Sequence, residues 1–257
     1  MQQHHSQATK SRYGGLVGTG FAVLIVVGVT FGLHARFALG EKPQPRQPLT
    51  VETVEYVIQD RYQRDVQEPC LAFIRAFAPR LKRLSRRFEA SDRRVGGSLM
   101  RVYRDARFAK GQASYKTNVG IQFRHESGRD VHAPGFYVHI APDECFLGLG
   151  TWHPDAAALK RIRRAIVEQP DRWRRATRGR RFRDTFSLEG DRLRRPPQGF
   201  PAEHPLVEDL KWKDFVGLRP SSTEEVLRAD FAQRVEEAFA AGRPLVRFLC
   251  QALELPF

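Results

Sequence analysis

Hydrophobic residues after Pro69 recur at intervals of three and four, the spacing of one face of a helix. They are Phe73, Ile74, Phe77, Leu81, Leu84 and Phe88, and arginine and lysine residues stand between them. Pro69 suits the first turn of a helix. Pro79 lies inside the run and predicts a kink or a break there. The pattern therefore predicts an amphipathic helix with a basic outer face.

In the middle of the chain, the hydrophobic period changes from that of a helix to two, which is typical of strands with one buried face. Four short runs alternate in this way: Met100 and Val102; Val119, Ile121 and Phe123; Phe136, Val138 and Ile140; Cys145, Leu147 and Leu149. Residues 141–144 read as a turn between the last two runs. Short connections and single-face alternation favour an antiparallel sheet.

Helical spacing returns after the strands. Pro154 and Asp155 open a helix with Leu159, Ile162 and Ile166 inward and Lys160, Arg161, Arg163 and Arg164 outward. Residues 194–205 hold four prolines and must be irregular.

The end of the chain predicts two more helices. Ser221 with Glu224, and Ser222 with Glu225, each fit a capping box. The following helix should stop at Gly242, and Pro244 should open the last one. This order of elements predicts an α+β fold, an antiparallel sheet of about four or more strands with helices packed on one face.

The N-terminal region carries the strongest physical signal. Residues 14–33 run for twenty residues without a charge, long enough as a helix, at about 30 Å, to span a bilayer. A cleaved signal peptide ending at Gly40 is an alternative, and so is an upstream extension foreign to the mature protein. We predict an N-terminal tail (1–13), a transmembrane helix (14–33), a proline-rich linker (34–48) and a single α+β domain (49–257).

Composition narrows the class of protein. Lys and Arg number 43 against 29 Asp and Glu, a net charge of +14, while 41% of residues are hydrophobic and 11% aromatic. A chain of this kind builds a packed core, which excludes global disorder. Cys70, Cys145 and Cys250 lie far apart without metal-binding spacing, so we predict no metal, no cofactor and no disulfide framework. We predict a single-pass membrane protein from the uncharged segment 14–33, and the unpaired cysteines favour a cytoplasmic location for its folded domain.

The alternation of side chains between the two faces of a strand defines the candidate site. If the alternating hydrophobic residues face the helices, their neighbours share the other face. Cations and tyrosines on one face suit a phosphate-bearing or other anionic small ligand. Gly148 and Gly150 would let a ligand or another backbone approach the sheet closely. The predicted ligand-binding residues are Arg101, Tyr103, Arg104, Lys116, Tyr137 and His139, of which Arg104 reaches this face only if its strand ends or bulges.

Other interpretations stay open. The cations near Asp105 could form internal salt bridges, and the face could be an ordinary solvated one. Seven arginines surround Trp173 and Phe182 between residues 172 and 183, and this cluster could dock nucleic acid or anionic lipid. Its docking candidates are Arg174, Arg175, Arg180 and Arg181. No nucleophile elbow or metalloprotease motif is present, so catalytic residues are unknown and a hydrolase or transferase stays an alternative.

Five segments together resemble a bacterial and fungal family catalogued as domain of unknown function 2461. They are Gly96–Gly120, Ala133–Ile140, Phe146–Asp155, Arg194–Phe200 together with His204-Pro205, and Pro244–Leu249, in the same order. The resemblance implies a single compact domain, usually without a membrane segment, and supplies no activity, cofactor or catalytic residue. The chain departs from the family pattern before Arg61, where the linker and the apolar segment replace a further helix.

Overall fold

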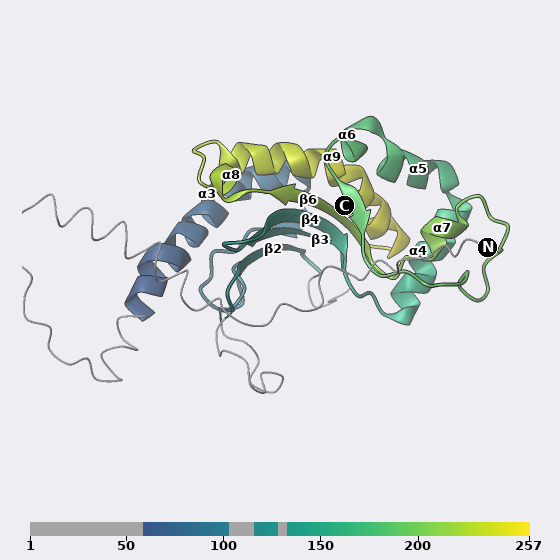
Figure 1. The fold of residues 1–257 in the computed structure, drawn as a ribbon, viewed down its shortest axis with the longest axis horizontal. Helices are drawn as coiled ribbons and strands as arrows, with labels where there is room; N and C mark the ends of the chain where they lie inside the picture. The colour runs from purple at the N-terminus through teal and green to yellow at the C-terminus, as the bar shows by residue number, and fades with distance from the viewer. Residues whose placement is uncertain (1–58, 103–115, 128–132) are drawn as a thin grey trace, which may run out of the picture. The chain divides into compact units, whose positions relative to one another are not determined.

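The computed structural model describes residues 59–102, 116–127 and 133–257, which form helices lying against one face of a curved sheet (Figure 1). The predicted tail, transmembrane helix and linker (1–13, 14–33 and 34–48) lie outside these residues and stay predictions. Within the described ranges, no helix has both the length and the apolar character needed to cross a membrane.

The first described helix confirms the amphipathic pattern. A π-helical turn η1 (Gln63–Gln67) leads directly into α3 (Glu68–Leu84), which carries Pro69 in its first turn. Of the kink or break predicted at Pro79, the break is absent, since the helix runs through that residue. The apolar side chains of α3 that are buried are Leu71, Ile74, Phe77, Leu81 and Leu84.

The sheet has six strands, and every neighbouring pair is antiparallel. Its order is β1-β2-β3-β4-β6-β5. The strands are β1 (Phe88–Glu89), β2 (Val119–His125), β3 (Gly135–Ile140), β4 (Cys145–Thr151), β5 (Ser187–Glu189) and β6 (Phe215–Ser221). The predicted α+β class, with an antiparallel sheet and helices on one face, is confirmed.

One predicted strand is wrong. Met100 and Val102 form no strand; instead Leu99 makes a single isolated bridge to Ile121. Leu99 is buried, whereas Met100 is partly exposed, so the inward residue of this segment is one position earlier than the alternation predicts. Leu99 fits the core because the bridge places it beside Ile121, which is itself buried.

The remaining helices follow the strands. They are α4 (Ala156–Glu168), α5 (Pro170–Arg178), α6 (Arg180–Arg183), α7 (Val207–Leu210), α8 (Thr223–Val226) and α9 (Phe231–Ala252). Ser222 caps α8 by accepting a hydrogen bond from the Glu225 amide, as its capping box predicts. The predicted stop at Gly242 is wrong: α9 continues through Gly242 and Pro244, because its buried face packs along the sheet.

The core lies between the sheet and the helices α3 and α9. Phe77 of α3 lies 5.0 Å from Phe123 of β2 and 6.1 Å from Phe239 of α9, ring centre to ring centre. Phe136 of β3 is 4.9 Å from the same Phe239. All four rings are fully buried. The hydrophobic residues of the strands therefore face these two helices, and their neighbours face the opposite side, which we call the open face.

Candidate functional site

Strand register places the predicted polar residues of β3 in the centre of the open face. Tyr137 pairs with Gln122 on one side and Gly148 on the other. His139 pairs with Gly120 and with Phe146. Because paired residues point to the same side of a sheet, these side chains form two adjacent rows.

Tyr137 and His139 contact each other and an aromatic neighbour. The Tyr137 hydroxyl is 3.2 Å from His139 Nδ1. The His139 ring stacks on Phe146, with centroids 4.5 Å apart and planes only 6° from parallel. Burial lowers the pKa of His139, although the carboxylates of Glu144 and Asp143 act against this, and burial raises the pKa of Tyr137. His139 is therefore mostly neutral near pH 7 and offers hydrogen bonds rather than charge.

The glycines of the open face give space to neighbouring groups of the fold, which are side chains at Gly120 and Gly148 and, at Gly150, another backbone, as one of the two predicted alternatives has it. The place of a Cβ on Gly120 is 2.7 Å from the Tyr137 hydroxyl and 2.9 Å from Met100 Sδ. Leu218 covers Gly148 in the same way, at 3.3 Å. Gly150 instead faces the backbone carbonyl of Phe215.

The structure describes only some of the predicted ligand-binding residues. Tyr103 and Arg104 lie outside the described residues. The Lys116 amide donates a hydrogen bond to the Val102 carbonyl at 2.8 Å, which brings the backbone of Lys116 close to that of Arg101. Arg101 is exposed and has no hydrogen-bond or ion-pair partner among the described residues. Met100, not Arg101, lies beside Gly120 on the open face.

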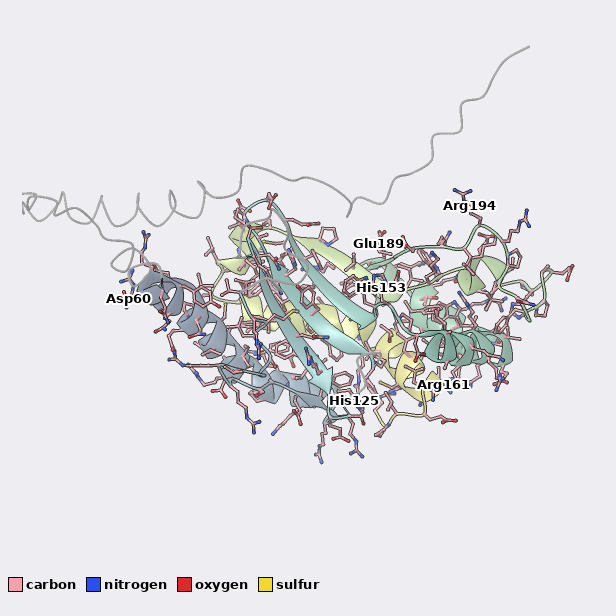
Figure 2. All side chains as sticks on the ribbon, turned by 90° about the horizontal axis from the view of Figure 1, so that it is seen from below. Asp60, His125, His153, Arg161, Glu189 and Arg194 are labelled. Carbon is pink, nitrogen blue, oxygen red and sulfur yellow. The ribbon has the colours of Figure 1, made fainter. Side chains whose placement is uncertain are left out.

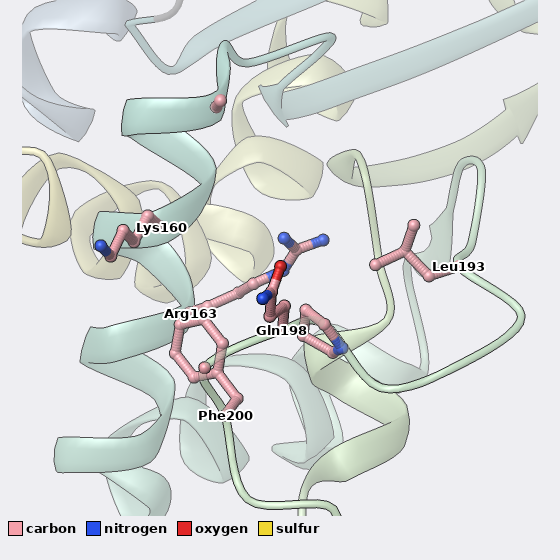
Figure 3. Close-up of a pocket in the computed structure, with 8 residues that line it drawn as sticks. Lys160, Arg163, Leu193, Gln198 and Phe200 are labelled. Atoms are coloured by element: carbon pink, nitrogen blue, oxygen red, sulfur yellow. The ribbon is translucent and has the colours of Figure 1, made fainter.

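A cavity of about 580 Å³ lies between α4 and the proline-rich segment, lined by Lys160, Arg163, Gln198 and Phe200 among others (Figure 3). Arg163 is buried, which corrects its predicted outward position. Its guanidinium donates hydrogen bonds to the carbonyls of Leu210 and Trp212 at 2.8 and 2.9 Å. The head of Lys160 points away from Arg163 (Figure 3). The guanidinium of Arg163 thus fixes the backbone of the segment that precedes β6.

A histidine–aspartate pair that the sequence did not predict lies where β4 leads into α4. His153 Nδ1 is 3.0 Å from Asp214 Oδ1 (Figure 2 labels His153). Asp214 is buried and also accepts hydrogen bonds from the amides of His153 and Asp191, at 2.8 and 3.1 Å. The His153 side chain is 62% exposed, and its ring stacks on the exposed Trp152. A buried carboxylate that orients one imidazole nitrogen leaves the other facing solvent.

His153 also has a strained backbone, with φ at +49°, a conformation that costs energy outside glycine and that concentrates at functional sites.

His125, by contrast, has a structural role. Its Nε2 donates to the Pro256 carbonyl at 2.8 Å, and its Nδ1 accepts from the Ser127 amide at 3.1 Å. Both of its nitrogens are satisfied within the fold.

The arginine cluster predicted to dock nucleic acid or lipid spans α5 and α6. Arg174 pairs with Asp171 at 3.0 Å, and Arg180 pairs with Asp184 at 3.5 Å. Each partner is within one helical turn, so these two charges are partly neutralised. Arg175 and Arg181 have no ion-pair partner in the part of the chain that the structure describes.

Metal-binding and thiol chemistry find little support in the described ranges. No three His, Cys, Asp or Glu side chains gather there as the ligands of a metal ion. The three cysteines are free thiols. Burial raises the pKa of Cys70 to about 11 and that of Cys250 to about 12, so neither is a thiolate near neutral pH.

The fold defines an α+β domain in which helices cover one face of a six-stranded antiparallel sheet. The family described as conserved hypothetical protein (DUF2461) matches residues 58–248, and the chain belongs to this family. The resemblance found in the sequence is thereby confirmed. Neither the curated proteins nor the solved structures contain a match to the chain.

Proposed function

We propose that the domain binds a small anionic ligand, a phosphate-bearing one first, on the open face of its sheet. The hydrogen-bonded pair of Tyr137 and His139 carries this proposal. Both are polar, half-buried groups in the middle of a face that α3 and α9 do not cover (Figure 1). Such groups commonly orient a ligand by hydrogen bonds.

Three cationic residues on or near β2 support an anionic ligand. Lys116 precedes β2, and its backbone pairs with the segment that carries Arg101. Arg124 of β2 lies on the open face and donates to the Gln122 amide oxygen at 3.1 Å. Arg101, Arg124 and Lys116 have no carboxylate partner among the described residues, so their charge stays available to a ligand.

An NMR titration of the full chain with inorganic phosphate, and in parallel with a nucleoside monophosphate, tests the proposal. The imidazole signals of His139 should shift and saturate. Arg101→Ala and Lys116→Ala should each weaken binding by about tenfold or more, the range for a lost charge-assisted hydrogen bond. Tyr137→Phe should weaken it less, because a neutral hydrogen bond contributes less.

Arg86→Gln is the matched control, because Arg86 is an exposed arginine between α3 and β1. This variant also removes one positive charge, but at a position distant in sequence from Tyr137 and His139. It should leave the titration of the His139 signals unchanged. The proposal is wrong if His139 does not respond to either ligand, or if Arg86→Gln weakens binding as much as Arg101→Ala does.

A second candidate function is hydrolysis of a phosphate ester, which the pair of His153 and Asp214 favours. A water attacking phosphorus would give its proton to His153 Nε2 as the bond to the leaving oxygen breaks. Turnover of p-nitrophenyl phosphate by the wild-type chain, lost in His153→Gln at an unchanged melting temperature, would support it. No turnover by the wild type removes this candidate.

Docking of nucleic acid or anionic lipid through Arg174, Arg175, Arg180 and Arg181 stays an alternative proposal. It requires affinity that falls steeply with salt, because counterions are released as phosphates are neutralised. The ion pairs of Arg174 and Arg180 reduce the charge that this cluster offers.

A further inference from the structure

Two helices on the covered side of the sheet bring four arginines together around one cavity. Helices α5 and α9 pack through Trp173, whose ring centre lies 5.2 Å from that of Phe248. A cavity of about 340 Å³ opens beside this contact. Its charged lining comes from both helices: Arg172, Arg175, Arg243 and Arg247.

Helical spacing explains why the four side chains meet. Arg172 and Arg175 are three residues apart on α5, and Arg243 and Arg247 are four apart on α9, so each pair shares a face of its helix. Like charges at this spacing repel each other in an isolated helix. The fold therefore keeps an unfavourable arrangement on two helices at once.

None of these arginines has a carboxylate partner in the part of the chain that the structure describes. Arg172 donates to the amide oxygens of Gln169, at 2.6 Å, and Gln251, which are neutral groups. The guanidinium groups of Arg243 and Arg247 lie 5.6 and 4.9 Å from the centre of the Phe257 ring, which holds them without neutralising them.

Arg243 shows the clearest unmet requirement. Its Nε is buried and has no hydrogen-bond partner among the described residues. A buried donor without a partner costs free energy unless a ligand or water supplies an acceptor. Burial, and secondarily the charge of Arg247, also lower the pKa of Arg243, as expected for a cation without a counter-charge.

We propose that this four-arginine cavity binds a small soluble phosphate compound carrying at least two negative charges. Guanidinium groups bind phosphate oxygens through paired N–H donors, and four of them suit more than one phosphate group. The volume is at the lower end of the range for small-molecule sites, which fits a diphosphate rather than a polymer. The site is separate from the open face, since α5 and α9 lie on the covered side of the sheet (Figure 1).

Isothermal titration calorimetry of the full chain with inorganic pyrophosphate tests the proposal. We expect saturable binding at one site. Arg175→Gln and Arg243→Gln should each weaken it by about tenfold or more, as for a lost charge-assisted hydrogen bond. Arg174→Gln is the matched control on the same helix, because Arg174 is already paired with Asp171 and is not part of the cavity lining.

Stability separates a binding role from a structural one. Without pyrophosphate, Arg243→Gln should not lower the melting temperature by more than about 3 °C, because it removes a charge that Arg247 repels. Arg175→Gln, at an exposed position, keeps the binding test valid should Arg243→Gln fail to fold.

Three results would overturn the proposal. Pyrophosphate could give no saturable heat with the wild-type chain, or Arg174→Gln could weaken binding as much as Arg175→Gln. Binding to anionic lipid vesicles without binding to pyrophosphate would show that the arginines form a membrane contact instead. Neither cavity variant should change the His139 signals in the phosphate titration, so failure of this site and failure of the open-face site are distinguishable.

Discussion

Nδ1 of His139 lies 3.2 Å from the hydroxyl oxygen of Tyr137, and this hydrogen bond joins two titratable groups on the open face. When the proton of the neutral ring resides on Nε2, the hydroxyl donates to Nδ1, and when it resides on Nδ1, the ring donates to the hydroxyl oxygen. Protonation of His139 would force the hydroxyl to become the acceptor. Burial lowers the pKa of His139 and so favours the neutral ring, whichever of the two groups donates this hydrogen bond.

The first prediction concerns the titration of His139, followed by the NMR shifts of its ring protons. Its pKa should lie below the ordinary value of about 6.5. Phe146→Ala should raise it, because the imidazole loses the ring that stacks on it and gains contact with water. Glu144→Gln should lower it further, because the carboxylate favours the charged ring. A pKa above 6.5 in the wild type, or shifts of the same sign in both variants, would contradict this account.

The second prediction concerns the link between α3 and α9. Glu236 of α9 accepts hydrogen bonds from Arg80, at 2.7 Å, and from Arg83, at 2.8 Å. Glu236→Gln should lower the melting temperature at pH 7 by about 2–4 °C, a modest effect because the arginines are partly exposed to solvent. Glu237→Gln is the control, since the Glu237 carboxylate accepts a hydrogen bond from the neutral Gln233 amide and forms no ion pair among the described residues.

The ion pair between Arg83 and Glu236 also predicts that stability depends on pH. The hydrogen bond from Arg83 is the main cause that lowers the pKa of Glu236 below its ordinary value. A lowered carboxyl pKa gives stability that is present above about pH 4.3 and is lost as pH falls through the folded-state pKa. The difference in melting temperature between wild type and Glu236→Gln should therefore shrink below that pH. A difference that stays constant down to pH 3 would show that this ion pair contributes nothing.

The sequence predicted the elements whose pattern is strong and local. Strands β2, β3 and β4 alternate cleanly, and four of the predicted periodic residues, Ile74, Phe77, Leu81 and Leu84, are buried on α3, whereas Phe88 lies in β1. Strand β6 was missed because Gly217, Arg219 and Pro220 interrupt its hydrophobic pattern. Pro244 was expected to start a helix, yet tertiary packing of α9 offsets the loss of one backbone hydrogen bond.

The same distinction between local pattern and tertiary packing decides which residues of the candidate sites the sequence could bring together. Tyr137 and His139 could be placed together because two residues on one strand share a face regardless of the tertiary fold. His153 and Asp214 are 61 positions apart and meet only because β4 and β6 are neighbours. Arg175 and Arg243 come from different helices, and the local signs at their cavity are the like-charged spacings of Arg172 with Arg175 and of Arg243 with Arg247.

The last prediction concerns the contact between β4 and β6. Gly150 has φ at +119°, and a Cβ at this position would lie 2.0 Å from the Phe215 carbonyl oxygen. Backbone cannot move away as a flexible side chain does, so Gly150→Ala adds a steric clash to the strain of its φ angle. Gly199 has φ at +80° with open space around it, and it isolates the strain alone. Gly199→Ala should reduce the free energy of unfolding by about 1–2 kcal/mol.

Gly150→Ala should cost more than about 3 kcal/mol or prevent folding, because the clash adds to the φ strain. Urea denaturation followed by tryptophan fluorescence measures both variants, since Trp173 is buried in the same core. Equal losses in the two variants would mean that Phe215 does not approach Gly150 as closely as the structure shows. A larger loss at Gly150 supports the register of β4 against β6, on which the placement of Asp214 beside His153 depends.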